Sequence, residues 1–187
     1  GTYYVYAKTA ETNNYKEDRS ATVALTVNEP VVEAASVTKA DGTDGGTYES
    51  LPAALNAAQN GDTVTLLSDV DLGETYVTID KSITFDLGDK TLSSSKAWLS
   101  YGVLMVKNAT VTVKNGTVKA TGSGSCAIRA YGSGASMTLE DVTATVTSDK
   151  SSVTVGDFGS AVIKSGDYQG LYVGAKSQVT LEGGTFR

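Results

Sequence analysis

Two short acidic clusters contain the first candidates for chemistry in this sequence. Asp69 and Asp71 lie in "DVD", and Asp86 and Asp89 lie in "DLGD". Carboxylates at this spacing suit Ca²⁺, and acids on neighbouring strands could supply the pair that inverting glycosidases hold roughly 6.5–9.5 Å apart. Short acidic segments are also typical of solvated turns, so both interpretations of these four aspartates stay open.

The chain contains no histidine. This excludes Ser-His-Asp and Cys-His catalytic arrangements and the usual zinc sites within it. The single cysteine, Cys126, lies in an alternating segment, and we expect a small buried residue rather than a reactive thiol. We predict no catalytic residue and no cofactor, with Ca²⁺ at the four aspartates as the alternative.

A third group of candidates combines aromatic rings with a guanidinium group. Exposed rings stack on sugar faces, so these residue types are suited to glycan binding. The predicted ligand-binding residues are Trp98, Tyr101, Met105, Arg129, Tyr131 and Tyr172. The competing interpretation is that the tryptophan folds over apolar surface and the tyrosines are ordinary strand residues.

The strands that must position these side chains are predicted from a repeated sequence pattern, which we call the phrase. Segments such as "TVTVKNGTVKA" and "SMTLEDVTATV" place apolar residues on both sides of one outward column. That column reads Thr65, Thr84, Thr112, Thr138, Val162 and Thr180. Near-regular repetition of this kind predicts a solenoid in which each copy of the phrase is one coil.

A second outward position tests the predicted register. Two residues after the first column, the sequence reads Leu67, Asp86, Lys114, Glu140, Lys164 and Glu182, so the charge alternates in sign from the second coil onward. Parallel strands about 4.8 Å apart would place each charge between two opposite charges. We expect this row to fix the register more than to add stability.

Between successive phrases lies another alternating segment, so each coil has at least two strands. The outward residues of these second segments are Thr78, Met105, Arg129, Thr154 and Tyr172. Insertions such as "SSSKAWLSYG", "TGSGS" and "TSDKSS" precede them at the same point of successive coils. We expect these loops to form a ridge beside the outward residues, where function tends to reside.

One helix is predicted before the coils, over about residues 51–60. Ser50 is the expected N-cap, Pro52 falls in the first turn and Gly61 ends the helix. With "TYESL" before it and "GDTV" after it, this segment resembles the N-terminal cap of right-handed parallel β-helices of the pectate-lyase-like type. The resemblance implies an all-β fold, a right-handed parallel β-helix over residues 37–187 closed by this helix.

Residues 1–28 are predicted to be two alternating strands joined by a polar loop. They are similar to the last two strands of the Ig-like domains found in Gram-positive surface proteins. Residues 29–36 are predicted to be a linker. An isolated hairpin is only marginally stable, so its missing strands were either cut away or come from another chain.

Charge and repeat pattern together favour a non-catalytic module. A net charge of −6 argues against nucleic acid and anionic membranes as partners, and the absence of a long apolar run argues against membrane insertion. We predict an extracellular adhesin or stalk of a bacterial surface or secreted protein, with a polysaccharide or host glycoprotein as partner. Because many polysaccharide lyases and glycosidases share this architecture, a carbohydrate-active enzyme or its accessory domain is the alternative. Self-association through the chain ends into a fibre is a further one.

Overall fold

The computed structural model describes residues 2–8, 19–26, 32–97 and 101–187. The chain divides into two compact units, Gly1–Val32 and Glu33–Arg187. In the described ranges, no helical segment has the length and apolar character that a bilayer crossing requires.

The first unit contains the predicted antiparallel hairpin. Strand β1 (Thr2–Val5) pairs with β2 (Val23–Thr26), so that Tyr4 lies opposite Ala24. The Arg19 guanidinium lies over the Tyr6 ring, 5.1 Å from its centroid. Val5, Val23 and Leu25 are each more than half exposed, at 51%, 63% and 51%. The hairpin therefore carries apolar side chains that are largely exposed.

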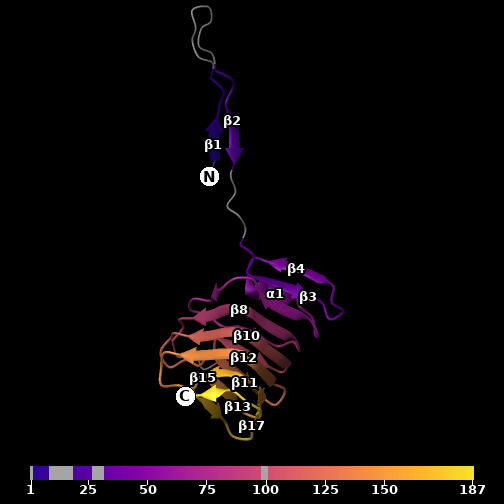
Figure 1. Ribbon diagram of the computed structural model, residues 1–187, viewed down its shortest axis with the longest axis vertical. Coiled ribbons are helices and arrows are strands. Elements are labelled where there is room, and N and C mark those ends of the chain that lie inside the picture. The colour runs from indigo at the N-terminus through magenta and orange to yellow at the C-terminus, as the bar shows by residue number, and fades with distance from the viewer. Residues whose placement is uncertain (1, 9–18, 27–31, 98–100) are drawn as a thin grey trace, which may run out of the picture. The chain divides into compact units, whose positions relative to one another are not determined.

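The second unit is a parallel β-solenoid of about four turns, which confirms the predicted fold class. Figure 1 shows its strands stacked coil upon coil. A five-stranded parallel sheet consists of β7 (Val77–Ile79), β9 (Leu104–Lys107), β11 (Ile128–Tyr131), β13 (Val153–Gly156) and β16 (Leu171–Val173). The second sheet is larger and contains the repeated phrases.

This larger sheet follows the order β17-β14-β12-β10-β8-β5-β3-β4. Its long strands are β8 (Thr84–Ser94), β10 (Thr110–Ala120) and β12 (Ser136–Val146), with β14 (Ser160–Ile163) and β17 (Gln178–Leu181) after them. The short strands β6 (Val70–Asp71), β15 (Gly166–Tyr168) and β18 (Thr185–Phe186) pair along the second halves of this stack. Each long strand thus contributes to two faces of the solenoid.

The bend within each long strand occurs at residues in the left-handed region. Asp89, Asn115 and Asp141 have φ values of 60°, 56° and 53°. Asn and Asp tolerate positive φ, so these residue types suit a recurring corner. Gly116 follows at φ 155°, and a Cβ there would lie 2.5 Å from the Cβ of Leu87. In β10 this position therefore requires glycine for space as well as for conformation.

The strand register agrees with the prediction from the second coil onward. Thr112 pairs with Thr84 and Thr138, and Val162 pairs with Thr138 and Thr180. The first coil was placed wrongly, because Thr63 and not Thr65 pairs with Thr84, while Thr65 lies beside Asp86. A shift of two residues leaves every side chain on the same face, so alternation alone could not detect it.

Stacking brings the alternating charges together. Lys114 Nζ lies 3.4 Å from Asp86 Oδ2, and Lys164 Nζ donates to Glu140 Oε1 at 2.6 Å. This hydrogen bond, together with the charge of Glu140, raises the pKa of Lys164. In the first coil, the residue that pairs with Asp86 is Thr65. Leu67 therefore does not belong to the row of alternating charges.

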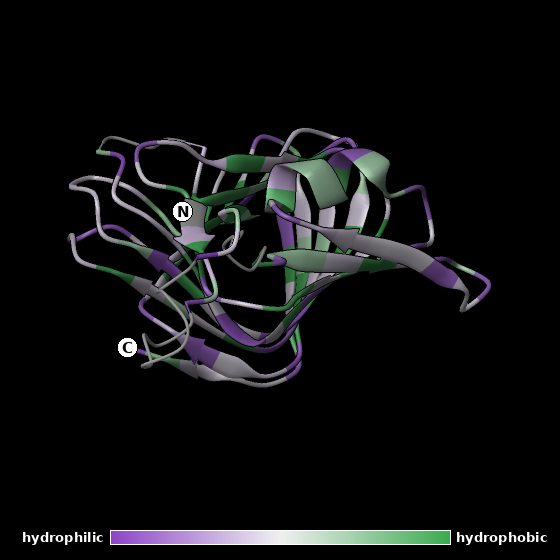
Figure 2. Ribbon diagram, turned by 90° about the horizontal axis from the view of Figure 1, so that it is seen from above, coloured by the Kyte–Doolittle hydropathy of each residue, from purple (hydrophilic) through white to green (hydrophobic). Residues whose placement is uncertain are grey.

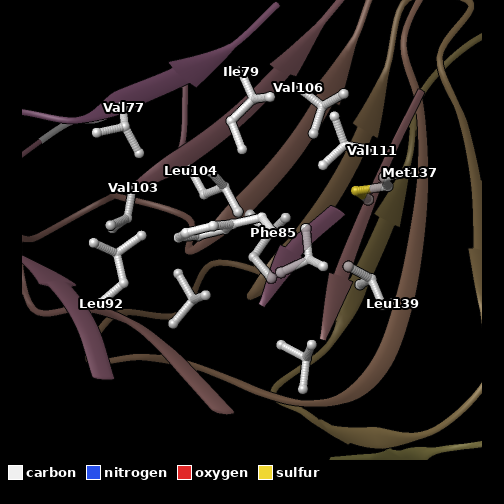
Figure 3. Packing of buried hydrophobic residues seen from close by; sticks show 14 of the residues in the cluster. Val77, Ile79, Phe85, Leu92, Val103, Leu104, Val106, Val111, Met137 and Leu139 are labelled. Carbon is white, nitrogen blue, oxygen red and sulfur yellow. The ribbon is translucent and has the colours of Figure 1, made fainter. Parts of the chain in front are cut away.

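The core lies between the two sheets and consists of the inward residues of every coil. In Figure 2, hydrophobic and hydrophilic residues alternate along the strands. Figure 3 shows side chains from both sheets, among them Phe85, Leu104 and Leu139, pointing into one interior, and all three have zero exposure. Leu181 pairs with the buried Ile163 and so lies in the inward column as predicted, but it is 55% exposed because no described strand pairs with the far edge of β17.

A helix and a hairpin cover the first coil. Helix α1 (Leu51–Ala57) begins at Ser50, whose hydroxyl accepts from the Ala53 N–H at 3.4 Å, and its C-cap is Ala58. The helix is thus shorter than the predicted residues 51–60. Strand β3 (Ala35–Thr38) pairs antiparallel with β4 (Asp44–Tyr48) and with β5 (Thr63–Leu66). This hairpin covers the outer edge of β5, which would otherwise be open.

Candidate binding face

The outward residues of the five-stranded sheet form a continuous column. Thr78 pairs with Met105, Met105 with Arg129, Arg129 with Thr154, and Thr154 with Tyr172. We call these five residues the Arg129 column. They alternate with inward residues, such as Ile128 and Ala130, that have zero exposure. Residues separated by 18 to 27 positions in the sequence therefore lie on adjacent strands about 4.8 Å apart.

The members of the Arg129 column differ in accessibility. Tyr172 is 58% exposed, Arg129 and Thr154 are half-buried, and Met105 is only 6% exposed. Met105 does not belong to the main core cluster, although its neighbours Leu104 and Val106 do. The structure therefore leaves the Met105 side chain little surface for direct ligand contact.

Arg129 is held against the neighbouring side chain Tyr131. Its guanidinium carbon lies 4.7 Å from the centroid of that ring, within the range of a cation–π contact. Gly156 pairs with Tyr131 on the next strand, and a Cβ there would lie 3.2 Å from Arg129 Nη2 and 3.6 Å from the Tyr131 ring. The missing side chain at Gly156 thus leaves room for the guanidinium group.

A hollow of about 350 Å³ adjoins the accessible end of the column, which we call the Arg129 hollow. It is lined by Gly124, Cys126, Arg129, Asp149, Lys150, Ser151, Thr154 and Tyr172. Two cationic side chains and one carboxylate therefore face this space. Burial raises the pKa of the Cys126 thiol, so this group is a neutral thiol at neutral pH.

The loops beside the column stack on one another as the sequence predicted. Ser125 Oγ donates to the Lys96 carbonyl at 2.6 Å, and Thr147 Oγ1 donates to the Thr121 carbonyl at 2.8 Å. Gly122 lies so close that a Cβ would be 1.9 Å from the Lys96 carbonyl oxygen. These contacts hold the described loops of successive coils in register. Trp98 lies outside the described residues.

Tyr101 occupies a different part of the same face. Its ring stacks on Tyr76, with centroids 5.6 Å apart and planes at 28°, and Tyr101 is 47% exposed. Of the predicted ligand-binding residues, the structure thus brings Arg129, Tyr131 and Tyr172 together and places Tyr101 beside the first coil. The sequence reasoning missed Tyr76, Asp149 and Lys150, although it identified "TSDKSS" as a loop beside the column.

Three of the four aspartates proposed as calcium ligands, in the pairs Asp69 with Asp71 and Asp86 with Asp89, accept hydrogen bonds from backbone N–H groups. Asp86 accepts from the Gly88 N–H at 2.9 Å and from Asn115 Nδ2 at 3.1 Å, besides its contact with Lys114. Asp69 accepts from Thr91 N–H at 2.8 Å, Asp71 accepts from Gly73 N–H at 2.9 Å, and Asp89 forms a corner. Among the described residues, no group of three or more Asp, Glu, Cys or His side chains is placed to hold a metal ion.

Comparisons with protein-family models, curated proteins and solved structures find no match to this chain.

Proposed function

We propose that this chain is a non-catalytic glycan-binding module that presents its ligand site on the Arg129 column. The observation that carries the proposal is the Arg129 hollow, where a held guanidinium, an ammonium group and an exposed ring from three coils surround about 350 Å³. A volume of this size lies within the range of small-molecule sites. The site is built by coil stacking, so it belongs to the folded solenoid.

The chemistry of the hollow suits a saccharide. Arg129 and Lys150 supply donors for hydroxyl and acidic groups, while Asp149 and Thr154 supply acceptors. Tyr172 offers a largely exposed ring for stacking on a sugar face. The tight contact of Arg129 with Tyr131 lowers the entropy that ligand binding must remove, because the guanidinium is already positioned.

The small number of carboxylates in the described lining of the Arg129 hollow favours a binding function over a catalytic one. The hollow has one described carboxylate, Asp149, whereas glycoside hydrolysis usually uses two. Asp86, Glu140 and Asp62 are each paired with a lysine. We place the module in an extracellular, surface-attached or secreted bacterial protein, as adhesin or stalk. This setting is supported by the resemblance of its sequence to pectate-lyase-like β-helices and to Ig-like strands.

A glycan array with two matched variants tests this proposal. Arg129→Gln removes the guanidinium from the hollow, and Lys119→Gln removes one charge from an exposed position on the other sheet. Hydrogen bonds to charged groups contribute about 1.5–3 kcal/mol, so Arg129→Gln should weaken binding roughly 10- to 100-fold. Lys119→Gln should bind as the unchanged protein does.

The same protein preparation tests the enzymatic alternative. We expect no product from pectins, alginates or glycosaminoglycans, with or without added Ca²⁺. An array without a single bound glycan, together with measurable polysaccharide cleavage, would overturn the proposal in favour of a carbohydrate-active enzyme.

A further inference from the structure

A second hollow lies at the other end of the same face, between helix α1 and the first coil. Its volume is about 330 Å³. It is lined by Pro52, Leu55, Asn56, Tyr76, Val77, Thr78, Asp80 and Lys81. We call it the α1 hollow. Thr78 is also the first member of the Arg129 column, so the two hollows share one line of outward residues.

The one cationic side chain in the described lining of the α1 hollow, Lys81, is hydrogen-bonded within the protein. Lys81 Nζ donates to the carbonyls of Leu55, Asn56 and Ala58, at 3.0, 2.7 and 2.8 Å. An ammonium group has three protons, so these three contacts use all its donors. The Lys81 side chain therefore satisfies carbonyls at the C-terminal end of α1, and its charge is offset by these carbonyls.

Two polar side chains of the hollow are available instead. Asp80 is exposed and, within the described parts of the chain, forms no side-chain hydrogen bond or ion pair. The Asn56 side chain is also exposed and offers both a donor and an acceptor. Together they can bind a ligand that carries several hydroxyl groups. The available charge is negative, opposite to that of the Arg129 hollow.

The remaining lining is apolar and aromatic. Leu55 of α1 is half-buried, and Pro52 is exposed at the start of the same helix. The Tyr76 ring stacks on Tyr101, packs against the core and contributes to the lining of the hollow. An aromatic surface beside a carboxylate and an amide matches a sugar ring, which has apolar C–H faces and a hydroxyl rim.

We infer that the α1 hollow is a second saccharide subsite and that it takes a neutral pyranose. The inference rests on the proposed glycan-binding function, and it adds the class of sugar and a separate location. The subsites are close, because Thr78 and Arg129 are two strand spacings apart, about 10 Å. A single oligosaccharide running along the stack can therefore occupy both.

Titrations followed by ¹⁵N-resolved NMR test this inference on the whole chain. The probes are the methyl glycosides of glucose, galactose and mannose, with Nα-acetyl-lysine methylamide as a cationic, peptide-like probe. We expect at least one glycoside to shift the amide signals of Asn56, Thr78 and Asp80. Asp80→Asn should weaken that binding at least fivefold, whereas the matched variant Asp149→Asn, in the Arg129 hollow, should leave it unchanged.

The outcomes separate this inference from the proposed function. If no glycoside shifts these signals, or if the lysine probe alone does, the α1 hollow is not a neutral-sugar site. Shifts confined to Ser151 and Thr154 would overturn the inference while leaving glycan binding at the Arg129 hollow intact. The glycan array tests the Arg129 hollow independently. If Arg129→Gln binds glycans as well as the unchanged protein does, that result counts against the proposed function and not against this inference.

Discussion

Asp62 gives the sharpest test of how the first coil is held. This carboxylate is only 3% exposed and lies between the hairpin, the helix and β5. It accepts from Gln59 N–H at 2.8 Å, from Ala40 N–H at 3.0 Å and from Lys39 Nζ at 3.1 Å. Asp62→Ala should therefore loosen the cap of the solenoid without removing apolar contacts.

The cost of this substitution follows from the groups that lose their acceptor. A backbone N–H left without a partner costs about 1–3 kcal/mol when it is buried. Two such groups are affected, and both are only partly buried, so water recovers some of the loss. The Lys39 side chain is 33% exposed and should add less than about 1 kcal/mol. We expect a decrease of about 2–4 kcal/mol in the free energy of unfolding.

Urea denaturation followed by circular dichroism measures this change. The matched control is Asp80→Ala, which removes an exposed carboxylate and should change stability by less than about 0.5 kcal/mol. Hydrogen bonds, first among them the one from the Gln59 backbone, lower the pKa of Asp62. Its contribution should therefore be complete above about pH 4 and disappear as the pH falls through the lowered pKa.

The account of Asp62 would be refuted by either of two results. One is an Asp62→Ala variant as stable as Asp80→Ala at pH 7. The other is a stability difference between the unchanged protein and Asp62→Ala that stays constant when the pH falls from 5 to about 2. The unfolded state binds a proton at Asp62 more readily than the folded state does, so this difference should shrink as the pH falls.

Three further substitutions test other parts of the fold, each by the urea midpoint. Lys81→Met removes three hydrogen bonds to the end of α1 and should cost about 1.5–3 kcal/mol, whereas Lys119→Met should be nearly neutral. Gly116→Ala places a methyl group 2.5 Å from Leu87 and should cost at least about 1–3 kcal/mol. Gly42 also has a positive φ, 85°, but has open space around it, so an equal loss in Gly42→Ala would show that the contact with Leu87 is irrelevant. Lys114→Glu puts a third acid beside Asp86 and Glu140, and should cost roughly 1 kcal/mol at low salt and less in 1 M NaCl. A salt-independent loss would argue against the charge row.

The coil stack could be predicted because each copy of the phrase carries the same information. Alternation identified inward residues such as Val113 and Leu139, and the alternating charges fixed the register from Asp86 onward. The first coil was shifted by two residues, since Thr63 and Thr65 face the same way and Leu67 supplied no charge to correct the error. Repetition therefore determines a register only where its positions differ in chemistry.

The cap and the candidate binding face were less predictable. Strand β3 of the β3–β4 hairpin pairs antiparallel with β5 of the first coil. This pairing occurs once, so the repeated pattern contains no information about it. In the Arg129 column, the order of the coils along the chain correctly predicted the neighbours of Arg129. The burial of Met105 depends on how surrounding side chains pack, which the alternating pattern does not specify. The Arg129 hollow likewise combines a loop residue, Lys150, with strand residues that are distant in sequence, so their proximity appears only in the folded structure.

The central claim is that stacking of parallel coils assembles one binding face from residues 18 to 27 positions apart. Nuclear Overhauser spectroscopy of the chain tests it most directly, through backbone contacts of Arg129. The parallel register predicts contacts with both Met105 and Thr154, and of Thr154 in turn with Tyr172. Contacts in antiparallel order between consecutive segments, or none from Arg129 to these two partners, would contradict it.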